Sequence, residues 1–456
     1  MKKLTKIIIC TLTIFTLAIN SIACSSNTAK NPSEADKADA TIAAGDITAS
    51  AEQGEATKEE APSKEDIVLT FSYWRLGTDP QASIMNDIIA TFEEENPGIT
   101  IETDSTPLGE ISNQLTIKAL GGNPPDILIM PFQQIPRFVE MGVVQPLDEY
   151  LAKDPGFKDS FFDYLLKLGM INGVTYGLPQ DIASNTLIYN KDLFAAAGLP
   201  DAPPQSYDEF VEYAQALTDT EKGIAGFGLG LANEPGNQAR LTCMYWASGA
   251  NIVGSDEKTV GMDTPEGIAA LQRIIDLSTK YGVTTASPLE LGYSSMLSMF
   301  ENGQIAMMQG NIGTIAPVLA VAPDMNIGIA PFKWDENGFS IECSMTFMTT
   351  NCEHKDEAWK FIQYLLGYEG IKAWAIPLNY LPPRPDVVAL PEVQANQYIQ
   401  AYLDILPNAI MYPRLLQNET VFETIFKEVS LAFQGTKTAE QASKDAAEAV
   451  RKIIAE

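Results

Sequence analysis

The stretch DIVLTFSYW, residues 66–74, alternates in polarity and is rich in residues that favour β-strands. It is followed by QASIMNDIIATFEEENPG, residues 81–98, whose apolar side chains recur at helical spacing and whose last three residues end the helix. Residues 99–102 (ITIE), 111–120 (ISNQLTIKAL) and 126–130 (DILIM) continue the order as strand, helix and strand. This alternation predicts a doubly wound α/β fold with a parallel sheet.

The second half of the chain shows a similar succession of helix and strand patterns. Residues 267–282 (GIAALQRIIDLSTKYG) form an amphipathic helical pattern, and residues 304–310 (QIAMMQG) and 325–332 (MNIGIAPF) are patterns typical of strands. The glycine-rich run at 226–231 (GFGLGL) lacks the third glycine of GxGxxG, so we interpret it as the edge of a sheet. The segment 438–455 predicts a closing helix, opened by a capping box from Thr438 to Gln441.

The N-terminus has the pattern of an export signal. Three lysines precede an apolar core at residues 7–19, which is short for a membrane span. The seam Ser21-Ile22-Ala23-Cys24 resembles the lipobox of bacterial lipoproteins, although the family usually has Leu where Ser21 stands. The resemblance implies that residues 1–23 are a signal peptide and that Cys24 carries a diacylglyceryl group. Two acyl chains suffice for stable anchoring. The alternatives are an ordinary cleaved signal and a short membrane anchor, in both of which Cys24 has no special role.

The segment after Cys24 predicts a stalk. Residues 25–65 contain no aromatic side chain and are crowded with Ala, Ser, Thr and charged residues. Such a composition cannot bury enough apolar surface to offset the entropy of ordering the chain. We therefore expect residues 24–65 to be a disordered tether between the membrane and a soluble part.

The net charge limits the classes of binding partner, and the cysteine content limits the possible disulfides. The formal net charge of −29 argues against nucleic acid as a partner and against adhesion to anionic lipid. Beyond residue 65 the chain has Cys243, Cys343 and Cys352, with no CxxC pair. We expect three buried free thiols, because Cys343 and Cys352 are too far apart for a disulfide if the run between them is extended.

Five segments, in this order and at these spacings, resemble the extracellular solute-binding proteins of ABC importers, in the carbohydrate-binding branch that includes maltose-binding protein. They are GGNPPDILIM (121–130), FVEMGVVQPLDEYL (138–151), LPQDIASNTLIYNKDLFAAAGL (178–199), SYDEFVEYAQALT (206–218) and HKDEAWKFIQYLLGYEG (354–370). The resemblance covers essentially the whole chain after the stalk.

The resemblance implies a two-lobed α/β fold of the periplasmic-binding-protein type II, each lobe a doubly wound sheet, with the ligand held in the cleft between the lobes. Lobe 1 would comprise residues 66–178 plus 341–381, and lobe 2 residues 179–340 plus 382–456. The chain would cross between lobes near 178–179, near 332–341 and near 381–384, where Pro382, Pro383 and Pro385 fit a stiff segment.

The chain offers little for catalysis. His354 is the only histidine, at a predicted helix start, and there is no GxSxG, HExxH or P-loop pattern. With 59 Asp and Glu residues, acidic pairs occur by chance on solvated helix faces, so a two-carboxylate glycosidase is not favoured. We expect no enzyme activity, no metal and no cofactor.

Aromatic, amide and charged side chains stand just past the predicted strands, where open α/β sheets bind ligands. A sugar has apolar C–H faces that stack on aromatic rings and a polar rim that accepts and donates hydrogen bonds. The family places its ligand contacts in these same loops. Three of the candidates have structural alternatives: Trp246 as core, Arg75 as a surface salt bridge and Asp181 as a helix cap. The predicted ligand-binding residues are Trp74, Arg75, Gln133, Gln134, Asp181, Asn185, Trp246, Asn311, Asn379 and Arg384.

We therefore expect a monomeric, lipid-anchored receptor on the extracytoplasmic face of the cell membrane. It would bind a carbohydrate, a small oligosaccharide, and deliver it to the permease subunits of an ABC transporter. Ile312 stands where the family often has an aromatic residue, so maltodextrin specificity does not transfer simply. The alternatives are a receptor for a polyamine or another small solute, suggested by the acidic charge, and a surface glycoside hydrolase.

Overall fold

The computed structural model describes residues 66–77, 80–107 and 110–455. The predicted signal peptide at 1–23, the predicted lipidation at Cys24 and the predicted stalk lie outside the described residues. The described residues belong to one compact unit.

A six-stranded sheet, called here the large sheet, is built around the first strand. Its order is β12-β11-β3-β1-β2, and β6 also pairs with β11, over Glu342–Phe347. Strands β1, β2 and β3 are parallel, which confirms the prediction for this stretch, whereas β11 runs antiparallel to β3 and β6. The strands are β1 Ile67–Tyr73, β2 Ile99–Asp104, β3 Ile127–Pro131, β6 Gly177–Ala183, β11 Ser340–Met348 and β12 Ile410–Met411.

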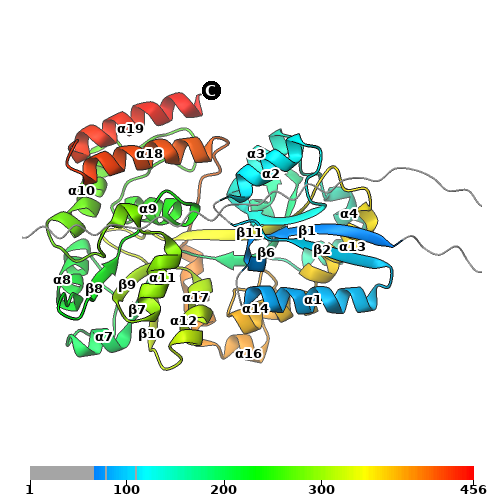
Figure 1. Cartoon of the computed structure of the whole chain (residues 1–456), viewed down its shortest axis with the longest axis horizontal. Coiled ribbons are helices and arrows are strands. Elements are labelled where there is room, and N and C mark those ends of the chain that lie inside the picture. The colour runs from blue at the N-terminus through cyan, green and yellow to red at the C-terminus, as the bar shows by residue number, and fades with distance from the viewer. Residues whose placement is uncertain (1–65, 78–79, 108–109, 456) are drawn as a thin grey trace, which may run out of the picture. The chain divides into compact units, whose positions relative to one another are not determined.

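Helices cover both faces of the large sheet (Figure 1). Helices α1 (Gln81–Glu95), α13 (Lys355–Leu366) and α14 (Tyr368–Leu378) pack against one another, and α2 (Ile111–Leu120) and α3 (Ile135–Glu140) lie on the opposite side in this view. Three buried aromatic side chains join strand to helix on the first face. The Phe361 ring lies 5.5 Å from that of Phe71 and 4.9 Å from that of Phe92, both in edge-on contacts.

A second, four-stranded sheet, called here the small sheet, has the order β10-β7-β9-β8. Only β8 and β9 are parallel, and β7 is antiparallel to β9 and β10, so this sheet is mixed rather than uniformly parallel. The edge position of β8 confirms the interpretation of the glycine-rich run. A Cβ at Gly226 would lie 2.0 Å from the carbonyl oxygen of Ala214, so only glycine lets α8 approach here. The strands are β7 Thr186–Asn190, β8 Ala225–Gly228, β9 Ile305–Gly310 and β10 Ile327–Ala330.

Three strands of the small sheet have helical cover. Helix α8 (Tyr207–Leu217) packs on β8, α11 (Tyr293–Glu301) on β9 and α17 (Gln397–Ile405) on β10. Helices α10 (Pro265–Thr279), α18 (Asn418–Phe433) and α19 (Ala439–Ile454) form a further layer, seen together in Figure 1. The predicted start of α19 is confirmed, since Thr438 accepts a hydrogen bond from the Gln441 backbone N–H at 3.1 Å.

The remaining elements are short or connect the two sheets. They are α4 Asp148–Lys153, α5 Pro155–Asp159, α6 Asp163–Leu168, β4 Met170–Ile171, β5 Val174–Thr175, α7 Lys191–Ala196, α9 Pro235–Ala247, α12 Ile315–Val321, α15 Pro385–Val388 and α16 Pro391–Gln394, with 3-10 turns η1 Trp74–Gly77, η2 Phe132–Gln134, η3 Pro288–Glu290, η4 Ile312–Thr314 and η5 Leu406–Asn408.

The chain passes between the sheets at identifiable places. Residues 184–185 lead from β6 to β7, and residues 331–339 lead from β10 to β11. Farther on, Leu381 accepts a hydrogen bond from the Ile182 backbone N–H at 3.2 Å, which ties the end of α14 to β6. The limits of two lobes remain a prediction, and these passages are where a rotation between them would be absorbed.

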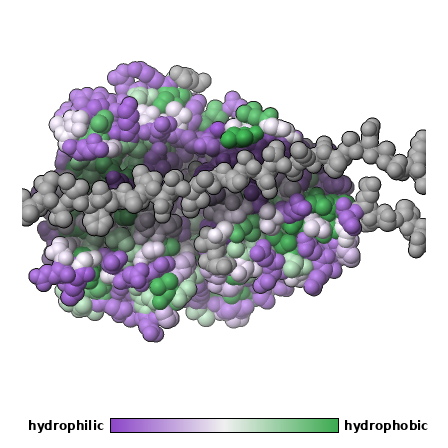
Figure 2. Space-filling view, viewed as in Figure 1, coloured by the Kyte–Doolittle hydropathy of each residue, from purple (hydrophilic) through white to green (hydrophobic). Residues whose placement is uncertain are grey.

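The visible face in Figure 2 is largely hydrophilic, with scattered hydrophobic patches, in keeping with the net charge of −29. Among the described residues, no helix has the length and apolar character that a membrane crossing requires.

Candidate functional site

The first strand ends in an aromatic and cationic corner. Trp74 and Arg75 begin η1, directly after β1. The half-buried Trp74 ring lies edge-on to the Tyr73 ring, with 4.8 Å between centroids. The Arg75 guanidinium carbon lies 5.4 Å from the Trp74 ring centroid and 4.6 Å from that of Tyr380, both within cation–π range. Arg75, which the sequence predicted, therefore lies beside the predicted Trp74 and also beside a further aromatic residue, Tyr380.

Tyr380 reaches this corner from the end of α14. It is buried, and its hydroxyl accepts hydrogen bonds from Arg75 Nη1 and, at 3.3 Å, from Gln81 Nε2. Burial raises the pKa of Tyr380, so the hydroxyl keeps its proton at neutral pH. The preceding residue, Asn379, has a φ of 57° and ends α14, and its side chain accepts a hydrogen bond from Asn396 at 2.6 Å. Asn379 thus shapes the turn that presents Tyr380.

Asp181 lies behind this corner, on β6 and not at a helix cap. Its buried carboxylate accepts hydrogen bonds from Ser344 Oγ at 2.8 Å, Trp374 Nε1 at 3.3 Å and Tyr73 Oη at 3.4 Å. All three donors belong to the large sheet or to α14. The oxygens of Asp181 are therefore engaged in holding the aromatic wall.

The small sheet contributes the opposite side. Asn311 follows β9 and accepts a hydrogen bond from the Gly313 backbone N–H at 2.9 Å, opening η4. A Cβ at Gly313 would lie 2.9 Å from the Tyr380 ring, so this turn closely approaches Tyr380. Tyr293, at the start of α11, has its hydroxyl 2.7 Å from Thr314 Oγ1. We name this set, which draws on both sheets, the junction site: Trp74, Arg75, Tyr293, Asn311, Thr314 and Tyr380.

A buried polar group adjoins the junction site through Tyr293. The Arg240 guanidinium carbon, on α9, lies 4.2 Å from the Tyr293 ring centroid, and Arg240 Nε donates to the Gln309 carbonyl at 2.9 Å. Burial lowers the pKa of Arg240, which is only 4 % exposed. Sequence reasoning missed both residues. An arginine inside the apolar run ARLTCMYWA, residues 239–247, was the available signal.

Asn185 belongs to this buried group and does not reach the junction site directly. Its Nδ2 donates to Glu342 Oε1 at 2.5 Å, and Ser340 Oγ donates to the same oxygen at 3.1 Å. Burial raises the pKa of Glu342. Asn185 therefore partners a carboxylate at the passage from β6 to β7.

The two predicted glutamines lie on η2, after β3. Gln133 Oε1 is buried and has no hydrogen-bond partner in the described part of the chain, and Gln134 is half-buried at the start of α3. Neither makes a hydrogen bond to a member of the junction site there. An unpartnered buried amide oxygen is a group that a water or a ligand would satisfy.

Trp246 lies apart from Trp74. It is 5 % exposed, near the end of α9, and its ring meets that of Tyr412 edge-on at 6.2 Å. One of its sides lines a cavity of about 350 Å³, together with the loop at 251–259 and residues after η5. The structure thus places Trp246 largely in the core and does not bring it to the aromatic corner.

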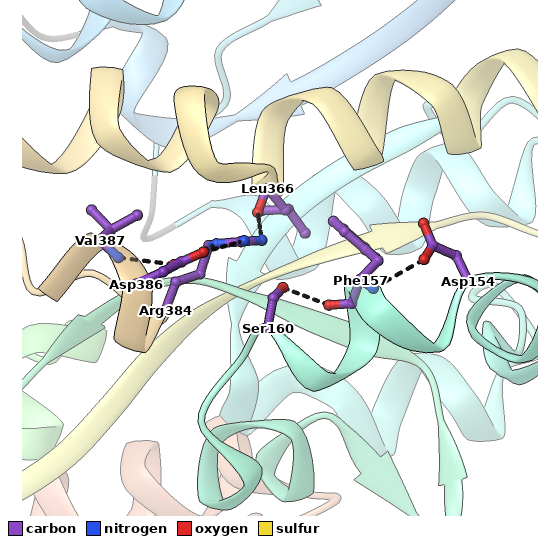
Figure 3. Close-up of polar contacts among 7 residues, drawn as sticks. All are labelled: Asp154, Phe157, Ser160, Leu366, Arg384, Asp386 and Val387. Atoms are coloured by element: carbon purple, nitrogen blue, oxygen red, sulfur yellow. Dashed lines mark hydrogen bonds and ion pairs between the residues drawn. The ribbon is translucent and has the colours of Figure 1, made fainter. Parts of the chain in front are cut away.

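Arg384 forms no hydrogen bond or ion pair with the junction site among the residues that the structure describes; Figure 3 shows its guanidinium between Asp386 and the Leu366 carbonyl. Its Nη2 and Nε donate to the Asp386 carboxylate at 2.7 and 3.1 Å, and its Nη1 donates to the Leu366 carbonyl at 3.3 Å. The Leu366 carbonyl is one of the unpaired groups at the end of α13, so Arg384 completes that helix end. In the same view, Ser160 donates to the Phe157 carbonyl at 2.6 Å, and the Phe157 N–H donates to Asp154 at 3.0 Å.

The histidine and the three cysteines of the described part of the chain lie where a catalytic role is not expected. His354 is exposed and precedes α13, as expected. Cys243, Cys343 and Cys352 are free and buried, which confirms the prediction. Burial raises the pKa of Cys352 to about 12, and it also raises the pKa values of the other two thiols, so they are unreactive at neutral pH.

Comparisons with known proteins give matches to solute-binding proteins. The family model described as bacterial extracellular solute-binding protein matches residues 87–401. A Brucella abortus protein named only as a binding protein is 26% identical over 84% of this chain and 92% of its own. The maltotriose-binding protein of Pyrococcus abyssi is 24% identical over 70% of this chain and 67% of its own.

The fold has close counterparts among solved structures. An ABC transporter solute-binding protein of Thermotoga lettingae, bound with α-D-tagatose, superimposes with a TM-score of 0.79 at 25% identity, covering 86% of this chain and all of the other. The predicted α/β fold class is confirmed at the level of the whole architecture.

Proposed function

Because the chain belongs to the bacterial extracellular solute-binding proteins, we propose that it captures a carbohydrate, a small oligosaccharide, and delivers it to the permease subunits of an ABC importer. The family acts outside the cytoplasm and consists of binding proteins rather than enzymes. The named ligands of its relatives support a saccharide, since one binds maltotriose and another is bound with tagatose.

The observation that carries the proposal is the composition of the junction site. The half-buried Trp74 offers an aromatic face, and the half-buried Arg75 and Asn311 offer hydrogen-bonding groups, while Tyr380 and Thr314 are buried and hold these side chains in place. Aromatic faces stack on the C–H faces of a sugar ring, and polar groups at their rim bind its hydroxyls. Arg75 Nε is buried and has no hydrogen-bond partner among the residues described, so the site has capacity for an acceptor.

Capture works through rotation of two rigid halves. Contacts from both sheets to one ligand favour the state in which the halves are close, so ligand shifts an existing equilibrium between open and closed forms. The passages at 184–185 and 331–339 would absorb the rotation. Because β6 keeps residues 177–183 in the large sheet, we move the first boundary between lobe 1 (predicted as 66–178 plus 341–381) and lobe 2 (predicted as 179–340 plus 382–456) from 178–179 to 184–185. No step requires a cofactor.

The tether is part of the proposal. Cys24 would carry the lipid that holds the monomeric receptor at the membrane, close to its permease. In Cys24→Ala the protein should be released into the medium or left uncleaved, while ligand binding by its folded part is unchanged. Detergent partitioning of both forms tests this: equal partitioning would rule the anchor out.

A titration screen tests the function. Purified protein is titrated calorimetrically with mono- and oligosaccharides and with spermidine, and the same mixtures are assayed for new reducing ends. We expect saturable binding of a saccharide without turnover. Saturation by spermidine alone would favour the polyamine receptor, and new reducing ends would favour the hydrolase. The guanidiniums of Arg75 and Arg240 would repel a polycation.

A further inference from the structure

Two arginines near the junction site, Arg75 and Arg240, have no carboxylate partner in the described part of the chain, whereas most arginines of this chain have one. Four arginines place a nitrogen within 2.6–2.7 Å of a carboxylate oxygen: Arg137, Arg273, Arg384 and Arg451. Arg75 and Arg240 have no such ion pair with any described residue. The chain has 59 acidic and 30 basic residues, so a shortage of carboxylates does not explain this.

Arg240 is the more deeply buried of the two. Its Nε binds a backbone carbonyl and its Nη1 lies 3.4 Å from Asn237 Oδ1, while Nη2 has no partner in the described part of the chain. A Cβ at Gly236 would lie 2.7 Å from Nη1, so the guanidinium folds back to the first turn of α9. That helix has 13 residues, and its N-terminus adds positive potential beside the guanidinium.

Each nearby carboxylate has at least one oxygen engaged by other donors, and none of them forms an ion pair with Arg75 or Arg240 in the described part of the chain. Asp181 influences Arg75 through space, but its oxygens accept from Ser344, Trp374 and Tyr73. Glu342 likewise accepts from Asn185 and Ser340, as described above. Glu234 influences Arg240, yet its Oε1 accepts from the Tyr293 backbone N–H at 2.6 Å. The free N–H groups of both guanidiniums therefore await an outside acceptor.

The two guanidiniums are linked through the aromatic residues of the junction site. Arg240 lies over the Tyr293 ring, whose hydroxyl contacts Thr314, and the adjoining Gly313 approaches the Tyr380 ring, over which Arg75 lies. A ligand that occupies the junction site therefore meets two unpaired positive charges between aromatic faces. Charged hydrogen bonds to a carboxylate are about twice as strong as neutral ones, and burial strengthens them further.

We propose that the captured saccharide is acidic and that a uronate carboxylate is bound by Arg75 and Arg240. This inference rests on the proposed function and specifies its ligand class. A neutral sugar would fill the site but leave both guanidiniums without a directly paired carboxylate, which is unfavourable for buried charged groups. The carboxylate could belong to a saccharide or to a free organic acid, and the test separates the two.

The experiment is titration calorimetry with four probes: trigalacturonate, its methyl ester, maltotriose and succinate. We expect trigalacturonate to bind roughly 10- to 100-fold more tightly than its ester, as loss of a charged hydrogen bond implies. Arg75→Gln should remove most of this preference, and Arg75→Lys should keep part of it. The matched control is Arg273→Gln, which removes an arginine that pairs with Asp335 and stacks on Tyr207, outside the junction site. It should bind as the wild type does.

Each outcome has a meaning. If the ester or maltotriose binds as tightly as trigalacturonate, the acidic ligand is wrong and the carbohydrate function stands. If succinate alone binds, both proposals are wrong and the ligand is a small organic acid. If no probe binds to folded protein, the acidic-saccharide inference is likewise overturned. The affinity of Arg240→Gln is interpreted only after its melting temperature shows that the variant is folded, because Arg240 is buried. If Arg240→Gln does not fold, Arg75→Gln still tests the inference.

Discussion

Arg137 on α3 donates a hydrogen bond to Glu419, in the first turn of α18, over 2.6 Å. Helix α3 packs beside η2 at the end of the large sheet, whereas α18 packs against α10 and α19. Arg137 also donates to Ser112 and Thr116 at 3.1 Å, which fixes its direction. The pair therefore ties together two groups of helices that the proposed rotation would separate.

Breaking this pair should favour the open form. Since both side chains are partly exposed, the contribution is on the order of 1 kcal/mol or less. We expect Arg137→Met to raise the radius of gyration of the ligand-free protein in small-angle scattering, with no change in the ligand-bound form. Arg451→Met is the control, because the Arg451–Asp263 pair joins α19 to the segment just before α10. An equal response of both variants would contradict a specific role for Arg137.

Trp74→Ala should weaken saccharide binding by about tenfold or more. The ring loses its stacking contribution and its buried area, and about 1.4 kcal/mol corresponds to one decade in the dissociation constant. Trp74→Phe should keep most of the affinity. Calorimetric titration of both variants measures the effect, and unchanged affinity in folded Trp74→Ala would remove this residue from the site.

Trp246→Ala should act on stability instead. A buried tryptophan replaced by alanine leaves a cavity and costs roughly 3–5 kcal/mol. We expect a fall of several degrees in melting temperature, with saccharide affinity of the folded protein within about threefold of wild type. A stable variant with tenfold weaker binding would instead place the 350 Å³ cavity beside Trp246 in the ligand path.

Asp181 allows a graded test of the wall behind the site. Asp181→Ala leaves the Ser344, Trp374 and Tyr73 donors without their acceptor, and each orphaned buried group costs about 1–3 kcal/mol. Asp181→Asn should cost less, because its carbonyl can face Trp374 and Tyr73 while its amide faces the Ser344 hydroxyl. Urea unfolding should rank the proteins wild type, Asn, Ala; equal midpoints would contradict this account.

Glu342 should make stability depend on pH. Burial raises its pKa in the folded protein above the ordinary value of about 4.3, so the folded state binds the proton more tightly than the unfolded state. Its contribution to the free energy of unfolding therefore falls as pH rises from about 4.3 through the raised pKa. Glu342→Gln should flatten this part of the profile. Urea unfolding from pH 4 to 8 measures it, and parallel profiles would exclude Glu342 as the cause.

The sequence predicted the elements that have a strong local pattern. The strands at 67–73 and 127–131 and the helices at 81–95 and 439–454 carry clear periodicity and caps, and they lie where expected. The direction of β7 and β11 was not predictable, because strand pairing depends on contacts distant in sequence.

The residues of the candidate site also include some that the sequence predicted and some that it did not. Trp74, Arg75 and Asn311 follow strands directly, so their convergence near Tyr380 followed from the rule that ligands bind beyond strand ends. Arg384 and Trp246 carried the same chemical signal but are used by α13 and by the core. Arg240 carried one local signal, a charge inside an apolar helical run, but that signal indicates burial and does not identify a ligand site. Tyr293, the first residue of α11, carried none.

Hydrogen–deuterium exchange with and without a saturating saccharide tests the central claim most directly. If the ligand binds at the junction site and draws both halves together, exchange should slow in segments 74–77 and 379–381, beside the large sheet, and in segment 311–314, after the small sheet. Slowing on one sheet only, or confined to the cavity beside Trp246, would contradict capture at the junction site.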